Sequence, residues 1–268
     1  MTKIIKKVLM CQPDFFRIDY VINPWMRTGA VVNQNKALRQ WEDVVRAYQK
    51  YNIEVEVIRQ DLNLPDMVFS ADQAFPFSKK RLVMSRFFYQ QRQSETRYYR
   101  KWFEQNDFEI INLPSECSFE GTGNCLFSNG NCFLGNGFRN SQKTSRILSK
   151  TVGKKVLVLD IIDSRFYHID TCLFILNPQT VFYYPRAFSR TSREIIKMYF
   201  KNSFVLEKEE ALNFAANSVV CQNTIFTQEG NLRFFRELGK LGYDVVELDT
   251  SEFFKAGGGL HCLTLILE

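Results

Sequence analysis

One segment pattern recurs four times along the chain, and it restricts the folds that this sequence can adopt. Each copy has an apolar run, a short polar turn and a second apolar run, and the copies span residues 69–85, 120–137, 168–185 and 213–228. In the second copy the turn is Asn129-Gly130, a dipeptide typical of tight β-hairpin connections. The pattern therefore predicts four hairpins rich in β-branched and aromatic residues.

Helices and further strands accompany the hairpins. Apolar residues over 35–51 recur at the spacing of an amphipathic helix, and helices are likewise predicted over 89–106, 141–152, 192–201 and 230–241. Additional strands are predicted over 7–10, 55–58, 109–112, 155–160 and 244–248. Residues 261–267 are interpreted as a last strand, beginning around Cys262, whose missing partner comes from the N-terminal segment.

These elements predict an α/β fold in which five small units close into a ring. Such a ring buries the edge of each unit and leads the strand ends near its axis into one pocket. Asp72, Glu120 and His168 lie near the start of three repeats, and they would meet Cys262 at the axis. No linker divides the chain, so residues 1–268 are interpreted as a single domain.

Composition argues against several other classes of protein. The 268 residues are 45% hydrophobic, which is enough to fill a sizeable core. The net charge is +6, but Lys and Arg are spread along the chain, and their densest cluster, 92–101, is interpreted as a solvated helix face. No apolar run reaches the length of a membrane span. The sequence therefore predicts neither a nucleic-acid partner nor a membrane partner.

Cysteine usage indicates the redox compartment. The seven cysteines include no C-x-x-C pair and mostly lie in apolar runs, where a thiol packs as a small hydrophobe. This pattern is typical of a reducing compartment, and we expect a cytoplasmic location. The sequence offers no convincing metal site, and neither a metal nor another cofactor is predicted.

Cys262 is the candidate nucleophile. It follows Gly257-Gly258-Gly259 after two residues, and glycines allow a backbone to approach a ligand closely. The alternative is a buried structural cysteine, which is the commoner role of an arbitrary cysteine in a strand. The glycine run favours the nucleophile.

Two histidines are the candidates for acid–base chemistry near neutral pH. His168 precedes Asp170 by two residues, so both side chains are expected on one face of a strand. A structural histidine is the alternative interpretation of that pair. His261 is expected to point away from its neighbour Cys262 and is given no catalytic role.

Four acidic residues lie in or beside the repeats: Asp66, Asp72, Glu120 and Asp170. Carboxylates bind planar guanidinium groups through paired hydrogen bonds. Three arginines are candidates for binding a substrate carboxylate, with solvated surface charge as the alternative: Arg86, Arg92 and Arg139.

Together these motifs resemble the guanidino-group modifying enzymes, which include arginine deiminase, dimethylarginine dimethylaminohydrolase, arginine dihydrolase and the amidinotransferases. The resemblance covers nearly the whole chain and rests on CQPDFF (11–16), INPWM (22–26), PDMVFSAD (65–72), FEGTGN (119–124), GNGFR (135–139), YHIDT (167–171) and GGGLHC (257–262). It implies the five-bladed pseudo-symmetric α/β propeller of that family, called the pentein fold. A small-molecule guanidino compound is the implied partner, and a homo-oligomer is compatible with the family.

The resemblance also implies a role for each candidate residue. Cys262 attacks the guanidinium carbon, and His168 protonates the leaving amine and then activates water, through a covalent thiouronium intermediate. Glu120 and Asp72 hold the guanidinium. The remaining implied substrate contacts are Asp170 to the same group, Asp66 to the amino group, Arg92 and Arg139 to the carboxylate, and Asn124 in or near the pocket.

Two departures from the family pattern influence the predicted reaction. Asn124 stands where many relatives have Asp, which lowers the negative charge near the pocket. Residues 22–26 look most like the arginine dihydrolase branch, but that branch has Asn where this chain has Asp72. An ionised Asp suits a cationic guanidinium better than a neutral ureido group. The sequence therefore favours single-step hydrolysis of arginine or a methylated arginine.

Three alternatives stay open at this point. Arginine dihydrolase activity would remove two ammonia molecules, and an amidinotransferase would use an amine in place of water. An inactive homologue that only binds a guanidino ligand is the alternative outside enzymes, and Asn124 is the residue that supports it.

Overall fold

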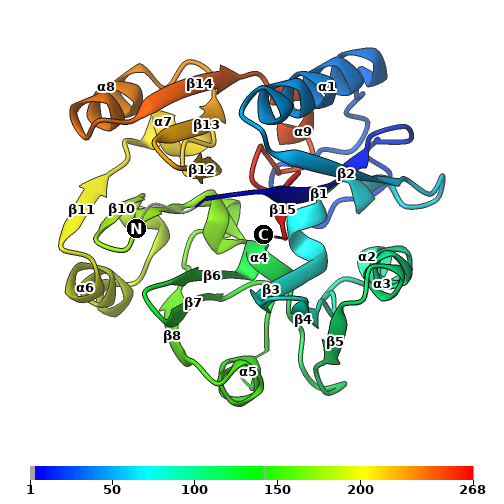
Figure 1. Ribbon diagram of the computed structural model, residues 1–268, viewed down its shortest axis with the longest axis horizontal. Coiled ribbons are helices and arrows are strands. Elements are labelled where there is room, and N and C mark those ends of the chain that lie inside the picture. The colour runs from blue at the N-terminus through cyan, green and yellow to red at the C-terminus, as the bar shows by residue number, and fades with distance from the viewer. Residues whose placement is uncertain (1–3, 142, 268) are drawn as a thin grey trace.

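A computed structural model describes residues 4–141 and 143–267, which form five three-stranded sheets around an axis (Figure 1). In every sheet the strand nearest the axis pairs antiparallel with the middle strand, and the middle strand pairs parallel with the outer one. This repeated arrangement confirms the five-bladed α/β propeller.

Each blade consists of an inner, a middle and an outer strand. In that order, the blades are β3 (Ala74–Ser78), β4 (Arg81–Met84) and β5 (Glu109–Asn112); β6 (Cys125–Ser128), β7 (Asn131–Asn136) and β8 (Lys155–Asp160); β9 (Leu173–Asn177), β10 (Thr180–Tyr183) and β11 (Asn202–Val205); β12 (Val219–Cys221), β13 (Thr224–Gln228) and β14 (Asp244–Leu248); and β15 (Leu265–Ile266), β1 (Lys7–Gln12) and β2 (Glu54–Arg59).

A helix connects the middle and outer strands of each blade, because parallel strands need a long crossover. These helices are α1 (Gln34–Lys50), α3 (Thr96–Gln105), α5 (Thr144–Val152), α6 (Arg190–Tyr199) and α8 (Leu232–Lys240). They lie at the periphery of the ring in Figure 1. In α1 the buried face includes Ala37, Trp41, Val44 and Tyr48, which is the spacing that predicted the helix.

The helix predicted over 89–106 is interrupted. It consists of α2 (Gln90–Gln93) and α3, separated by Ser94 and Glu95. Glu95 is fully buried and pairs with Arg92. The interpretation of 92–101 as a solvated face is therefore wrong at its first residue, because the break turns the Arg92–Glu95 pair into the interior.

The blade formed by β15, β1 and β2 combines both ends of the described chain. β15 pairs antiparallel with β1, and Leu9 lies opposite Leu265. This confirms that the N-terminal segment supplies the missing partner strand. Cys262, however, does not begin that strand, because it lies in a turn over 260–263.

A turn before each inner strand carries the chain to the axis. Three of these inner turns are helical: η2 (Ser70–Gln73), α4 (Gly121–Asn124) and η4 (Ile169–Thr171). The other two inner turns are residues 213–217, which follow α7 (Lys208–Leu212), and residues 260–263, which follow α9 (Ser251–Phe254) by five residues. α4 contacts both η2 and η4. The repeats thus begin with turns that meet, and the strands start a few residues later.

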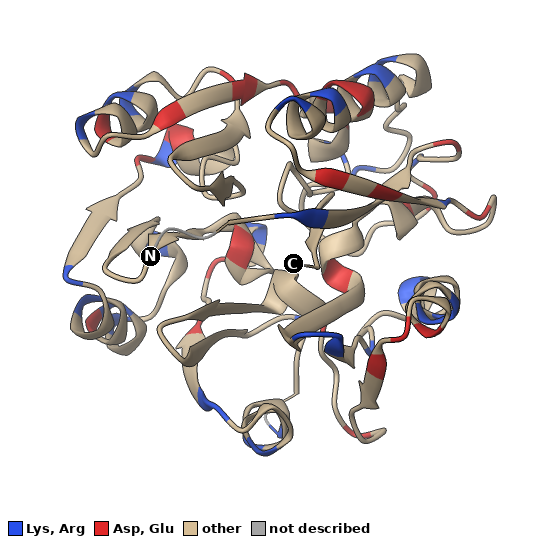
Figure 2. Ribbon diagram, viewed as in Figure 1, with Lys and Arg blue, Asp and Glu red and all other residues tan. Residues whose placement is uncertain are grey.

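Charged residues are distributed around the ring (Figure 2). Basic and acidic segments alternate along the peripheral helices and strands, and acidic segments also lie near the axis. Within residues 4–141 and 143–267, no helix is both long enough and apolar enough to cross a bilayer.

Candidate active site

The inner turns and their neighbours gather all the predicted site residues in the interior. None of the nine predicted site residues exceeds 3% exposure: Asp66, Asp72, Arg92, Glu120, Asn124, Arg139, His168, Asp170 and Cys262. Asp66 lies in η1 (Pro65–Val68), just before η2. Burying so many ionisable groups costs free energy unless they are paired or meet a ligand.

Cys262 is held by backbone and side-chain contacts from three other blades. Its backbone N–H donates to Asn217 Oδ1 at 3.2 Å, and its carbonyl accepts from the N–H of Ala71 at 3.0 Å. Its Sγ lies 3.2 Å from Asn217 Nδ2 and 3.3 Å from Asp170 Oδ2. Burial raises the pKa of the Cys262 thiol well above its ordinary value, and the negative charges of Asp170 and Asp72 add to this. The thiol is therefore neutral in the free site.

Glycines let the chain pass close to the site. A Cβ on Gly258 would lie 2.2 Å from the ring of Phe69, and a Cβ on Gly123 would lie 2.3 Å from Asp72 Oδ1. The same Cβ on Gly123 would lie 2.9 Å from His168 Nδ1. Side chains at these two positions would displace the groups that make up the site.

His168 and Glu120 form a close pair in the site. His168 Nε2 lies 2.7 Å from Glu120 Oε2, and His168 Nδ1 lies 3.4 Å from Asp72 Oδ1. Burial alone would raise the pKa of Glu120, but Arg139 and His168 outweigh it and lower that pKa to about 2. An ionised Glu120 therefore fixes the orientation of the imidazole.

His168 and Asp170 do not share one face of a strand as predicted. His168 precedes the 3₁₀ helix η4, and Asp170 lies within it. Because the backbone turns between His168 and Asp170, the two side chains point in different directions and have different partners. His168 meets Glu120, whereas Asp170 meets Cys262 and His261.

The prediction that His261 points away from the nucleophile is wrong. His261 Nδ1 lies 2.8 Å from Asp170 Oδ2, the same oxygen that contacts Cys262 Sγ. Alternation across a strand does not apply here, because both residues lie in the turn over 260–263. His261 and Cys262 are therefore linked through one carboxylate.

Three carboxylate oxygens in the site are left without a hydrogen-bond partner in the part of the chain that the structure describes. They belong to Asp66, Asp72 and Asp170, each through its Oδ1. Burial raises the pKa of Asp66 to about 6 and also raises that of Asp72. Unpaired buried acceptors are rare in folded proteins, and here they suit a ligand with several N–H donors.

The two predicted arginines belong to the same network. Arg92 binds Asp72 Oδ2 at 2.7 Å and also pairs with Glu95. Arg139 lies 3.2 Å from Glu120 Oε2 and between the rings of Tyr89 and Tyr167, at 4.7 and 4.4 Å. Their role as a carboxylate clamp stays a prediction. Arg86, the third candidate, is exposed.

Asn124 has a local structural contact. Its Oδ1 accepts a hydrogen bond from the backbone N–H of Glu120 at 2.8 Å. The contact fixes the backbone of the residue that orients His168. An Asp oxygen could accept the same bond, so the neutral side chain is compatible with the observed turn.

Asn217 is a site residue that the sequence analysis did not identify. Its side chain contacts both the Cys262 thiol and Asp170 Oδ2, the latter at 3.0 Å. Asn217 lies two residues before β12, as Asp72 lies two residues before β3. Superposing the four repeats on one another would have selected it.

The described residues include no group of three or more His, Cys, Asp or Glu side chains arranged to hold a metal ion. The site instead combines a thiol, an imidazole paired with a carboxylate, and unpaired carboxylate oxygens. On a five-bladed α/β propeller, these features are typical of the guanidino-group modifying enzymes, a class that uses a cysteine nucleophile.

The chain belongs to the dimethylarginine dimethylaminohydrolase family. The model of the family described as N,N dimethylarginine dimethylhydrolase, eukaryotic, matches residues 12–267. The chain is also 32% identical over 260 residues to the N(G),N(G)-dimethylarginine dimethylaminohydrolase of Mycobacterium tuberculosis, covering 97% of this chain and 85% of that protein.

Other relatives are named for a different activity. The chain is 36% identical over 264 residues to the bifunctional arginine dihydrolase/ornithine cyclodeaminase ArgZ of Synechocystis sp.. That match covers 97% of this chain but only 37% of the relative, so the chain spans little more than a third of that protein. A crystal structure of the ArgZ N-terminal domain covalently bound to a reaction intermediate matches with a TM-score of 0.93 and 35% identity, covering 98% of this chain and 97% of that one.

Proposed function

We propose that this protein hydrolyses the guanidinium group of free arginine, using Cys262 as the nucleophile and releasing ammonia and citrulline. One observation carries the proposal. The Cys262 sulfur lies 3.3 Å from Asp170 Oδ2, and the same buried group of inner turns holds unpaired oxygens of Asp170 and Asp72 and a preassembled His168–Glu120 pair. A planar cation is the ligand that satisfies those oxygens and places a carbon atom at the sulfur.

Substrate binding also favours ionisation of the Cys262 thiol. The pKa of the Cys262 thiol is high because of burial and of the negative charges of Asp170 and Asp72. A bound guanidinium offsets both charges and favours the thiolate. The thiolate thus forms when the substrate is bound, and without substrate the sulfur stays a thiol.

The reaction then proceeds in two steps. The Cys262 thiol gives its proton to His168 as the Sγ–carbon bond forms, and His168 passes that proton to the terminal nitrogen, which leaves as ammonia when its bond to the carbon breaks. Water next attacks the carbon of the thiouronium intermediate and gives one proton to His168, and the carbon–Sγ bond breaks. His168 returns this proton to the sulfur, and the second proton of the water is released to solvent. Glu120 stabilises the imidazolium that exists between proton transfers.

The carboxylates favour arginine over its dimethylated form. Asp170 Oδ1 and Asp72 Oδ1 both lack a hydrogen bond in the described structure, and the nearest donor to Asp72 Oδ1 is His168 Nδ1 at 3.4 Å, so each can accept from a ligand. A terminal nitrogen with two methyl groups has no N–H to give, so one buried oxygen would stay unpaired. Sites built to bind a donor discriminate strongly against analogues that lack it.

Arginine dihydrolase activity is the second candidate, because of the similarity to ArgZ. That reaction would require a neutral ureido product to react again at the same cysteine. Asp72 opposes this step, because an ionised carboxylate binds the cationic guanidinium better than the neutral urea. Citrulline as the end product supports our proposal, and ornithine supports the alternative.

The test is a product analysis with matched cysteine variants. Purified protein is incubated with arginine, monomethylarginine, asymmetric dimethylarginine and citrulline, and products are identified by mass spectrometry. Arginine should give citrulline, the dimethylated compound much less, and citrulline no further product. Cys262→Ser should lose turnover, whereas Cys117→Ser, at another buried cysteine outside the site, should keep it. Turnover by Cys262→Ser would refute the mechanism.

We further infer a cytoplasmic location. All seven cysteines are unbridged, which supports a reducing compartment.

A further inference from the structure

An opening on the propeller axis leads toward the candidate site. A cavity of about 760 Å³ lies there, within the size range of small-molecule sites. Each of the five inner strands contributes to its wall, through Phe75, Cys125, Leu173, Val219 and Ile266. The wall is therefore largely apolar, and exposed residues such as Ile4 and Lys79 line its mouth.

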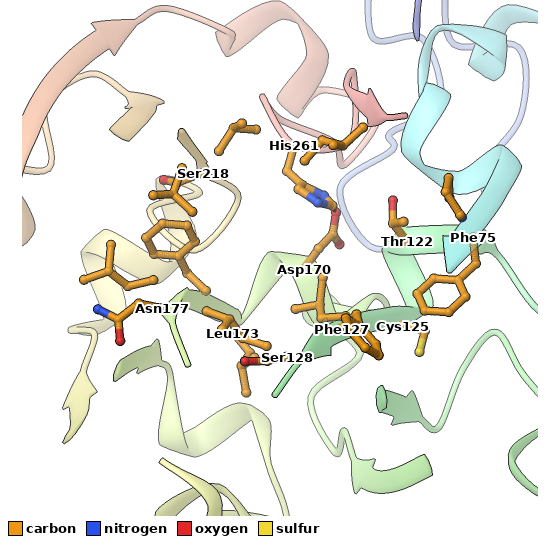
Figure 3. A pocket seen from close by; sticks show the side chains of 18 of the residues that line it. Phe75, Thr122, Cys125, Phe127, Ser128, Asp170, Leu173, Asn177, Ser218 and His261 are labelled. Carbon is orange, nitrogen blue, oxygen red and sulfur yellow. The ribbon is translucent and has the colours of Figure 1, made fainter. Parts of the chain in front are cut away.

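The polar groups deep in this axial cavity are those next to the nucleophile. Asp170 and His261 both line the cavity, and Figure 3 shows their side chains pointing toward one another. Asp170 Oδ2 is also the atom that lies 3.3 Å from Cys262 Sγ. Cys262 itself does not line the cavity. One carboxylate therefore separates the axial cavity from the reacting sulfur.

The opposite side of the site is covered by the segment between β1 and α1. The Ile22 carbonyl accepts from Arg139 at 3.0 Å, and Asn23 Nδ2 donates to the Ala256 carbonyl at 3.0 Å. The Trp25 indole N–H donates to the Arg165 carbonyl at 2.7 Å. With these contacts formed, the nine predicted site residues are at most 3% exposed, whereas the His261 side chain is 12% exposed.

The proposed reaction needs two small molecules to move while the amino acid stays bound. Ammonia must leave after the first step, and water must reach the same carbon for the second. Both are neutral and small, so an apolar passage admits them. The same passage disfavours zwitterionic amino acids, whose charges would lose their hydration.

We propose that the axial cavity is the port for the small neutral reactants and products, with ammonia leaving and water arriving past Asp170 and His261. The proposal rests on the proposed hydrolysis and adds a route to it. It also gives the enzyme a further activity. A small neutral amine that enters the port attacks the thiouronium carbon in place of water, the carbon–Sγ bond breaks, a proton passes to His168, and an N-substituted arginine is released.

The first test narrows the port at positions remote from the chemistry. Ile175 lines the cavity and is half-buried, as is Leu126 on the neighbouring blade. Ile175→Trp and Leu126→Trp should each lower kcat by about tenfold with little change in the KM for arginine, because binding occurs at the other side. Acid quenching and mass spectrometry should reveal more covalent adduct on Cys262. Ile175→Ala should behave as the unmodified enzyme.

The second test needs no variant. Methylamine and glycine are compared as acceptors with the unmodified enzyme at equal concentrations of their neutral amine groups. Methylamine should yield monomethylarginine alongside citrulline, and glycine should yield no transfer product. Equal transfer to glycine, or unchanged kcat and adduct in both Trp variants at unchanged Tm, would overturn the port. Absence of both adduct and citrulline in the unmodified enzyme would instead refute the proposed hydrolysis.

Discussion

Two halves of the site are prepared in opposite ways. Around Glu120 the charges are paired, since Arg139 and His168 both bind its carboxylate and lower its pKa to about 2. Around Asp66 and Asp72 oxygens are left unpaired, and burial raises the pKa of both carboxyls. In the proposed mechanism, the paired groups are the catalytic ones, which are oriented before substrate arrives, and the unpaired groups are the binding ones, whose unmet hydrogen bonds favour substrate.

Breaking the paired half should have the largest effect. Glu120→Gln removes the charge that orients His168 and leaves Arg139 without its buried carboxylate partner. We expect kcat to fall by about 10²–10⁴-fold, as for other positioned acid–base groups. Steady-state kinetics measure the effect. Glu252→Gln is the control, since Glu252 is a buried, ion-paired carboxylate outside the site. Equal losses in both variants would contradict a specific role for Glu120.

Neutralising Asp72 should weaken binding and at the same time make the nucleophile more acidic. Asp72→Asn removes an acceptor for the guanidinium, so KM for arginine should rise by about 10–100-fold. It also removes a negative charge that raises the pKa of the Cys262 thiol, so that pKa should fall. The pH dependence of iodoacetamide alkylation of Cys262 in the free enzyme measures this shift. An unchanged or higher pKa would contradict the assignment.

Substitution of Asp66 tests whether its buried, unpaired carboxylate lowers the free energy of unfolding. Its folded-state pKa of about 6 lies above the unfolded value of about 3.9, so its ionisation destabilises the native state as pH rises through this interval. Asp66→Asn should therefore be more stable than the unmodified protein by about 1–3 kcal/mol at pH 8. Thermal unfolding should show this gain shrinking as the pH falls toward 4. A gain that is independent of pH would contradict this explanation.

Substitution of Asn124 should change kcat the least, and it tests the part of the site in which Glu120 is paired. Asn124→Asp keeps an oxygen that can accept from the Glu120 N–H, so the turn should persist. We expect kcat within about threefold of the unmodified value, because ionised Glu120 is already paired with the Arg139 guanidinium. A large gain in activity would indicate that the neutral Asn124 impairs catalysis, as an inactive binding homologue would require.

The fold was largely predictable because hairpins and amphipathic helices have clear periodicities. The strands 109–112, 155–160 and 244–248 agree with β5, β8 and β14 residue by residue. The inner turns were not predictable, because three to five residues are too few to show a helical period. Their residues were therefore predicted as parts of the strands that follow them.

The errors about site residues share this cause. His168, His261 and Cys262 were assigned strand geometry, which fixed their directions wrongly. Which residues approach one another was nevertheless readable from the repeat, since pseudo-symmetry places equivalent positions at one axis. The buried Arg92–Glu95 pair was hidden because charged residues in a helical stretch usually face solvent.

The pairing of β15 with β1 has a consequence for biogenesis. These strands lie at opposite ends of the chain, and the turn that carries Cys262 comes just before β15. During synthesis the other four blades can form their sheets while the ribosome still holds the closing strand. The Cys262 sulfur reaches Asp170 only when the ring closes, so the candidate site is assembled in the last step of folding.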